Sequence, residues 1–131
     1  MARPRQEHPT PAELEVLRVL WERGPLTVRG VMQALDESGK TGRAYTSVMS
    51  LMNVMADKRL LSRAARGKAF LYTPKAARAA TLASMVGDLV DHAFAGSASD
   101  LFVHLLQKTT PQELADIRKA IDAWRRESRG R

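Results

Sequence analysis

The sequence predicts a mainly α-helical protein that carries one small β-hairpin. Apolar residues recur at three- and four-residue spacing through most of the 131 residues, which is the period of amphipathic helices. The pattern is broken by two short runs, 61–65 and 69–73, which flank Arg66-Gly67-Lys68 as a hairpin flanks its turn. Three short helices precede this hairpin and a second group of helices follows it.

The first two helices are delimited by capping residues. Thr10-Pro11-Ala12-Glu13 places a hydroxyl at the N-cap, Pro at the first helical position and a carboxylate at N3. A helix is therefore expected at about 11–23, ended by Gly24-Pro25. After a short extended link at Leu26, Thr27 caps a second helix that we expect to end before Glu37.

The third helix is expected at about 44–58. Its buried side carries Val48, Leu51, Met52 and Met55, and its outer side carries Thr46, Ser47, Ser50 and Asn53. The hairpin follows, with Gly67 supplying the positive φ of a tight turn, and Pro74 ends its second strand because Pro has no N–H to donate.

The remaining residues, 76–131, form three amphipathic helices. The first begins in the run 76–80, Gly96 and the run 97–99 separate it from the second, and Thr110-Pro111-Gln112-Glu113 caps the third. This region is too short to close a core of its own, so a second copy is its natural partner. The residues expected to form the dimer seam are Leu82, Val86, Leu89, Val90, Phe94, Leu101, Phe102, Leu105, Leu114, Ile117, Ile121 and Trp124.

Basic charge is concentrated in the middle of the chain. Residues 40–75 hold eight Lys and Arg against one acid, Asp57, a net charge of +7 that equals the charge of the whole chain. Such a cluster is typical of a surface that binds the phosphates of nucleic acid. Together with the order of the elements, it predicts a winged helix-turn-helix, whose third helix enters the major groove while the hairpin, the wing, grips phosphates.

Several classes of protein are disfavoured. The chain has no Cys, which excludes disulfides, thiolate metal sites and a Cys nucleophile. It has no glycine-rich phosphate loop and no HExxH or GxSxG motif, so we expect neither an enzyme nor a cofactor. Asp88, Asp91 and His92 could supply metal ligands, but without a second cluster we expect an exposed polar face and no metal.

The first nine residues, 1–9, are expected to form a flexible arm. They are polar and lack the apolar segment of a signal peptide, and the later apolar stretches are interrupted by Asp88 and Asp91. We therefore expect a cytoplasmic protein that does not associate with membranes.

The ordered set of motifs resembles the penicillinase repressor (BlaI/MecI) family from Thr10 to Asp122. The segments that carry the resemblance are Leu26-Thr27-Val28-Arg29, Ala44-Tyr45-Thr46-Ser47-Val48, Gly67-Lys68-Ala69-Phe70-Leu71-Tyr72-Thr73-Pro74, Phe94-Ala95-Gly96-Ser97 and Glu113-Leu114-Ala115-Asp116-Ile117-Arg118. The resemblance implies a homodimeric transcriptional repressor of palindromic promoter operators, with a DNA-binding domain at 10–75 and a dimerisation region at 76–131.

The resemblance also implies an upstream sensor or protease as a partner, because repressors of the β-lactam branch are cleaved at an Asn-Phe bond. This chain departs from that pattern: its single Asn, Asn53, precedes Val54, and His104-Leu105 aligns with the scissile position. The copper-responsive branch uses C-terminal cysteines, which are absent here. Val54 and Gly30 also stand where the family often has Arg and Glu.

Two groups of residues are expected to contact DNA. Arg43, Tyr45, Thr46, Ser47 and Ser50 lie at or near the start of the recognition helix, where hydroxyls and free amides meet phosphates or base edges. One hydroxyl could instead cap the helix, and Tyr45 could pack at the edge of the core.

Arg63, Arg66 and Lys68 of the wing are expected to contact the DNA backbone, although charged hairpin edges also resist aggregation. Two alternatives stay open: a non-specific architectural DNA binder, and a winged-helix module that binds a protein.

Overall fold

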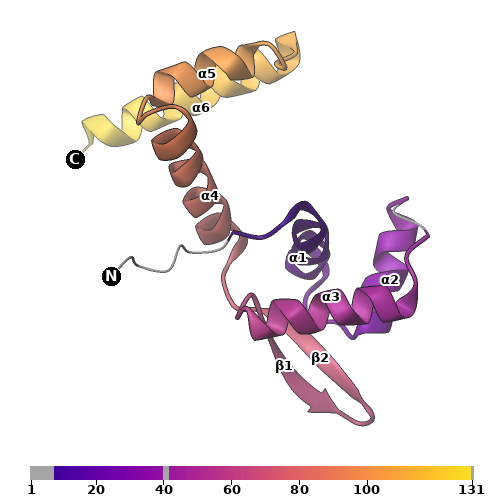
Figure 1. The fold of residues 1–131 in the computed structure, drawn as a ribbon. Coiled ribbons are helices and arrows are strands. Elements are labelled where there is room, and N and C mark those ends of the chain that lie inside the picture. The colour runs from indigo at the N-terminus through magenta and orange to yellow at the C-terminus, as the bar shows by residue number, and fades with distance from the viewer. Residues whose placement is uncertain (1–7, 40–41, 131) are drawn as a thin grey trace, which may run out of the picture. The chain divides into compact units, whose positions relative to one another are not determined.

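Three helices and a hairpin form the first part of the protein, in a computed structural model that describes residues 8–39 and 42–130 (Figure 1). They are α1 (Pro11–Arg23), α2 (Val28–Glu37), α3 (Tyr45–Asp57), β1 (Leu61–Arg66) and β2 (Ala69–Pro74). Then come α4 (Arg78–Ala93), α5 (Ala98–Leu106) and α6 (Pro111–Arg129). This is the predicted winged helix-turn-helix followed by a helical region. Most of the predicted N-terminal arm, together with residues 40–41, lies outside the described residues.

The chain divides into two compact units after Met85, within α4. The sequence instead predicts a boundary between residues 75 and 76, with a DNA-binding domain before it and a dimerisation region after it. That division by function stays a prediction.

The predicted caps of α1 and α2 are present. Thr10 Oγ1 accepts a hydrogen bond from the Glu13 amide at 3.2 Å, and the Glu13 carboxylate accepts one from the Thr10 amide at 2.9 Å. Thr27 Oγ1 accepts from the Gly30 amide at 3.1 Å. The prediction for the end of α2 was one residue short, because Glu37 is still helical; its carboxylate accepts from Arg23 at 2.7 Å.

The core of the first unit lies between α1, α2, α3 and the base of the hairpin. Leu26 forms an isolated bridge to Tyr72, with hydrogen bonds of 2.9 and 3.3 Å, so the link between α1 and α2 borders the hairpin. Leu51, predicted on the buried side of α3, packs against this core but is only partly buried. The core consists of Val16, Leu17, Leu20, Val28, Val31, Leu35, Val48, Met52, Met55, Leu61 and Tyr72.

The wing is a two-stranded antiparallel hairpin in which Arg66 pairs with Ala69 across the turn residues Gly67 and Lys68. Gly67 adopts φ 60°, as the turn chemistry predicts. Only Leu61 of β1 is buried; the rest of that strand is exposed. The wing is therefore anchored at its base and projects into solvent at its tip.

The helices of the second unit expose much of their apolar surface. No described residue of α4, α5 or α6 is buried. The predicted capping box is present at Thr110 and Glu113. The break before α5 is shorter than predicted: Ser97 caps the helix through the Asp100 amide, so residues 98 and 99 already belong to it. Within the described residues, no helix is both long and apolar enough to span a bilayer.

Candidate nucleic-acid interface

The start of α3 presents a row of exposed polar side chains. Tyr45, Thr46, Ser47 and Ser50 are all exposed, as their predicted role requires. The helix begins after Ala44, which makes no side-chain capping hydrogen bond. Because Thr46 and Ser47 lie inside the helix and do not cap it, the capping alternative is wrong, and their hydroxyls remain on the surface.

Tyr45 lies at the exposed start of α3, next to α2. Its side chain is 44% exposed, and the Arg29 guanidinium lies 5.9 Å from the centre of its ring. Arg29 belongs to the first turn of α2, so this contact brings a cation from α2 beside the start of α3. Arg29 was part of the motif that carried the family resemblance, but sequence reasoning did not identify it as a site residue.

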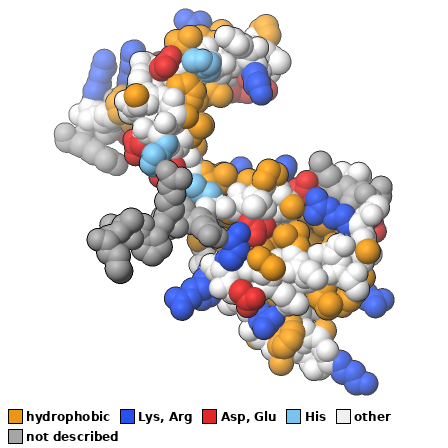
Figure 2. All heavy atoms as spheres, in the orientation of Figure 1, with side chains coloured by type: hydrophobic (Ala, Val, Ile, Leu, Met, Phe, Trp, Pro, Cys, Tyr) orange, Lys and Arg blue, Asp and Glu red, His pale blue; other side chains and the backbone are white. Residues whose placement is uncertain are grey.

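The tip of the wing carries Arg66 and Lys68 on either side of Gly67. Both cations are exposed, and neither forms a salt bridge with a described residue. Figure 2 shows Lys and Arg side chains, in blue, at the end of the hairpin. Both side chains are thus available to an anionic partner.

Two other cations of the basic segment are paired inside the protein. Arg43 donates to the Glu15 carboxylate of α1 at 2.8 Å, with about a third of its side chain exposed. Lys58 donates to both oxygens of Glu13 at 3.1 Å. Part of the +7 charge therefore stabilises the fold, and of these two residues only Arg43 was predicted to contact DNA.

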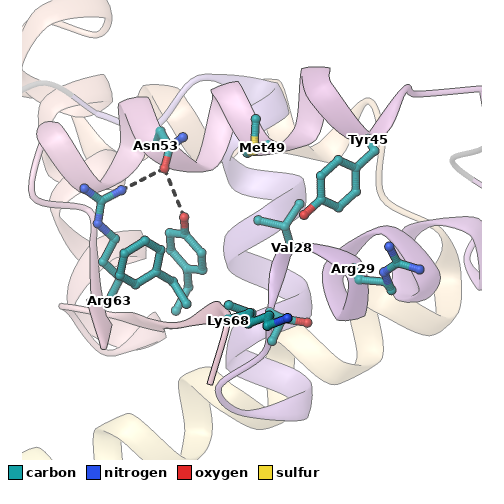
Figure 3. Close-up of a pocket in the computed structure, with 11 residues that line it drawn as sticks. Val28, Arg29, Tyr45, Met49, Asn53, Arg63 and Lys68 are labelled. Carbon is teal, nitrogen blue, oxygen red and sulfur yellow. Dashed lines mark hydrogen bonds between the residues drawn. The ribbon is translucent and has the colours of Figure 1, made fainter. Parts of the chain in front are cut away.

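A cleft of about 570 Å³ lies between α3, the start of α2 and the wing (Figure 3). The start of α2, the Tyr45, Met49 and Asn53 side of α3, and both strands of the wing line it. Among the described residues, Arg29, Arg63 and Lys68 are its charged lining residues, and no acidic one lines it. An anion can therefore approach α3 and the wing from the same side.

Arg63, predicted to contact the DNA backbone, is an exposed residue that lines this cleft. It donates to Asn53 Oδ1 at 2.8 Å and lies 4.9 Å over the ring of Phe70. The hydroxyl of Tyr72 donates to the same oxygen at 3.0 Å. Sequence reasoning missed the positions of Asn53 and Tyr72, because the contacts depend on how the wing folds back on α3.

Of the twelve residues proposed for the dimer seam, seven are exposed and five are partly buried. Phe94 also lies edge-on to the His104 ring, 5.1 Å away. Val103 and Leu106 are exposed apolar residues that sequence reasoning did not include. The exposed members of the predicted set are Val86, Leu89, Phe102, Leu105, Leu114, Ile121 and Trp124.

The acidic residues of α4 do not form a metal site. Within residues 8–39 and 42–130, no group of three His, Cys, Asp or Glu side chains could hold a metal ion. The ring of His92 instead bonds through Nδ1 to the backbone oxygen of Asp88 at 3.0 Å.

Comparison with known proteins identifies the family of this chain. The family model described as penicillinase repressor matches residues 9–123. The chain belongs to the penicillinase repressor family. It is therefore a DNA-binding transcriptional repressor and not an enzyme.

Two curated members of the family are similar over most of their length. The transcriptional regulators BlaI of Mycobacterium tuberculosis strains CDC 1551 and H37Rv are each 32% identical over 111 residues, 83% of this chain and 79% of theirs. A solved structure, the monomeric form of Bacillus licheniformis BlaI in complex with the blaP half-operator, is also similar. It has 23% identity and a TM-score of 0.47, over 57% of this chain and 89% of that one.

Proposed function

We propose that this penicillinase repressor is a homodimer that binds palindromic promoter operators. The observation that carries the proposal is the exposed, hydroxyl-rich start of α3 beside the exposed cations of the wing tip. Thr46, Ser47 and Ser50 meet base edges in the major groove, and Arg66 and Lys68 bind the flanking backbone. Tyr45 and Arg29 border the same surface.

The C-terminal helices supply the dimer contact. Trp124 is 66% exposed and Phe102 is 48% exposed, and such apolar side chains are stabilised when a second copy covers them. Two recognition helices related by twofold symmetry then bind two half-sites separated by about one helical turn, or a multiple of it. The operator lies on cytoplasmic DNA, which is where the repressor acts.

Release from the operator does not use an Asn-Phe cleavage in this chain. His104 and Leu105 align with the bond that is cleaved in the β-lactam branch. The His104 ring is hydrogen-bonded to the backbone oxygen of Asp100 within α5. A sensor or protease that acts on this repressor must therefore recognise another feature of it.

The test is fluorescence anisotropy at physiological salt, with DNA from upstream of the repressor's own gene and a scrambled fragment of equal length. We expect a preference of about a hundredfold or more, as for specific over non-specific sites. Equal affinity would instead indicate an architectural DNA binder or an operator elsewhere. Absence of binding to both would indicate a module that binds a protein.

A further inference from the structure

Asn53 receives one hydrogen bond from each strand of the wing. Arg63 of β1 and Tyr72 of β2 are directly paired across the hairpin, so their side chains emerge from the same face of the sheet. The Arg63 guanidinium and the Tyr72 hydroxyl both donate to Asn53 Oδ1, at 2.8 and 3.0 Å (Figure 3). One side chain of the recognition helix thus contacts both strands at a single position along the wing.

The chemistry of the donors determines the orientation of the Asn53 amide. A guanidinium has only N–H donors, so the atom of Asn53 that faces Arg63 must be the oxygen. Both lone pairs of this oxygen are then used, one by each strand. A residue without an acceptor at this position would leave both donors without their partner on α3.

The partners of Asn53 are themselves held in place. Tyr72 is 2% exposed and its backbone pairs with Leu26, which connects it to the link between α1 and α2. Arg63 stacks on the ring of Phe70, two residues before Tyr72 on the same strand. Beyond Leu61, however, every residue of β1 is exposed. The Asn53 contact therefore lies between the anchored base of the wing and its free tip.

We propose that Asn53 is a positioning residue that holds the wing at a fixed angle to α3, so that the wing tip and the recognition helix engage DNA as one unit. The inference rests on the proposed function, since it assigns the wing a role in operator binding. Its physical basis is preorganisation: a wing already held in the binding geometry loses less conformational freedom on binding. Asn53 acts through Arg66 and Lys68 and need not touch DNA itself.

The test is a double-mutant cycle between Asn53→Ala and the wing-tip replacement Arg66→Ala/Lys68→Ala, with affinity for operator DNA as the readout. In the wild type, we expect the wing-tip replacement to weaken binding about tenfold and to flatten the salt dependence. In the Asn53→Ala background, the same replacement should weaken binding less than about threefold, because the wing is no longer held in place. Equal effects in both backgrounds would overturn the proposal.

The matched control is Ser62→Ala. It removes another side-chain hydrogen bond of the wing, from Ser62 Oγ to the Thr73 backbone oxygen, and leaves the Asn53 contact intact. The wing-tip replacement should keep its full tenfold effect in this background. If Ser62→Ala reduced that effect as much as Asn53→Ala does, general loosening of the hairpin would explain the result, and the specific role of Asn53 would be refuted.

Amide hydrogen exchange of the free protein separates this proposal from the proposed function. Wing amides beyond Leu61 should exchange faster in Asn53→Ala than in wild type, with unchanged exchange in α1. Tyr72→Phe removes one of the two donors to Asn53 and keeps the ring, so it should show the same faster exchange. It replaces Asn53→Ala in the test if that variant fails to fold. Unchanged wing exchange in the folded variants would overturn the proposal, whereas failure of the wild type to bind DNA would overturn the proposed function.

Discussion

Nζ of Lys58 lies 3.1 Å from both carboxylate oxygens of Glu13, a side chain that is only 2% exposed. Glu13 belongs to the capping box of α1, and Lys58 is the C-cap residue of α3. The ion pair therefore joins the start of α1 to the end of α3. Lys58, a cation of the basic segment, therefore stabilises the fold.

Replacing Lys58 with Met should destabilise the protein. The Glu13 carboxylate would remain buried without its cation, which typically costs about 3 kcal/mol, the lower end of the range because Lys58 is a quarter exposed. Urea denaturation measures the change. The control is Glu37→Gln, which removes the exposed Arg23 pair and should change stability by less than about 1 kcal/mol. Similar losses for both variants would contradict a structural role specific to Lys58.

Replacing Arg66 and Lys68 with Ala should weaken binding to all DNA sequences alike. Log affinity falls with log salt, and each lost phosphate contact reduces the steepness of this fall by about 0.9. The slope should therefore become less steep by about 2. Anisotropy titrations at four salt concentrations measure it. If the slope and the affinity both stay at wild-type values, the wing tip makes no phosphate contact.

Replacing Thr46 or Ser50 with Ala should change which DNA sequences are preferred. Both hydroxyls are exposed on α3, and loss of a base contact reduces discrimination by about 1 kcal/mol or more. Binding to a set of single-base operator variants measures the preference. Ser128→Ala, an exposed Ser near the end of α6, should leave the pattern unchanged. The role of α3 in reading sequence fails if the Ala variants rank the sites as wild type does.

Ile121→Asp should convert the dimer into a monomer. Ile121 is 42% exposed in the single chain, so the charge does not disturb a core, but it would be buried between two copies. Sedimentation velocity measures the change. Lys119→Asp, nearly opposite on α6, is the control and should remain dimeric. A wild-type chain that sediments as a monomer at micromolar concentration would refute the proposed assembly.

Arg59→Gly should stabilise the protein by about 1 kcal/mol, because Arg59 adopts φ 66°, a left-handed conformation that is unfavourable for side chains with a Cβ. The reciprocal change, Gly67→Ala at φ 60°, should destabilise it by a similar amount. Apart from its chain neighbours, no described residue has an atom within 4 Å of the added Cβ, so only the backbone is affected. Thermal melts measure both. Shifts of the same sign would contradict the backbone explanation.

Local features of the fold could be predicted from the sequence. The caps at Thr10, Thr27 and Thr110 depend on residues three apart, and the turn at Gly67 depends on one glycine, so each is visible in a short window. The hydrophobic period located the buried face of α3 for the same reason. The end of α2 was missed by one residue, because nothing local shows that Glu37 extends the helix.

Contacts between residues far apart in the sequence could not be predicted in this way. Glu13 and Lys58 are 45 residues apart, and Tyr72 and Asn53 are 19 apart. Such pairs form only when the whole domain is packed, and the sequence shows only that cations are abundant. It could not distinguish Arg66 and Lys68, which are exposed and unpaired among the described residues, from Arg43, which was also predicted to contact DNA but is paired with Glu15.

The most direct test of the central claim, a dimer that reads two half-sites through paired recognition helices, is a change of operator spacing. A site selected from random DNA would be compared with the same site carrying a five-base-pair central insertion, about half a helical turn. We predict that the insertion lowers affinity at least about a hundredfold, towards that for scrambled DNA, because the second half-site then faces away. Equal affinity for both sites would contradict the claim.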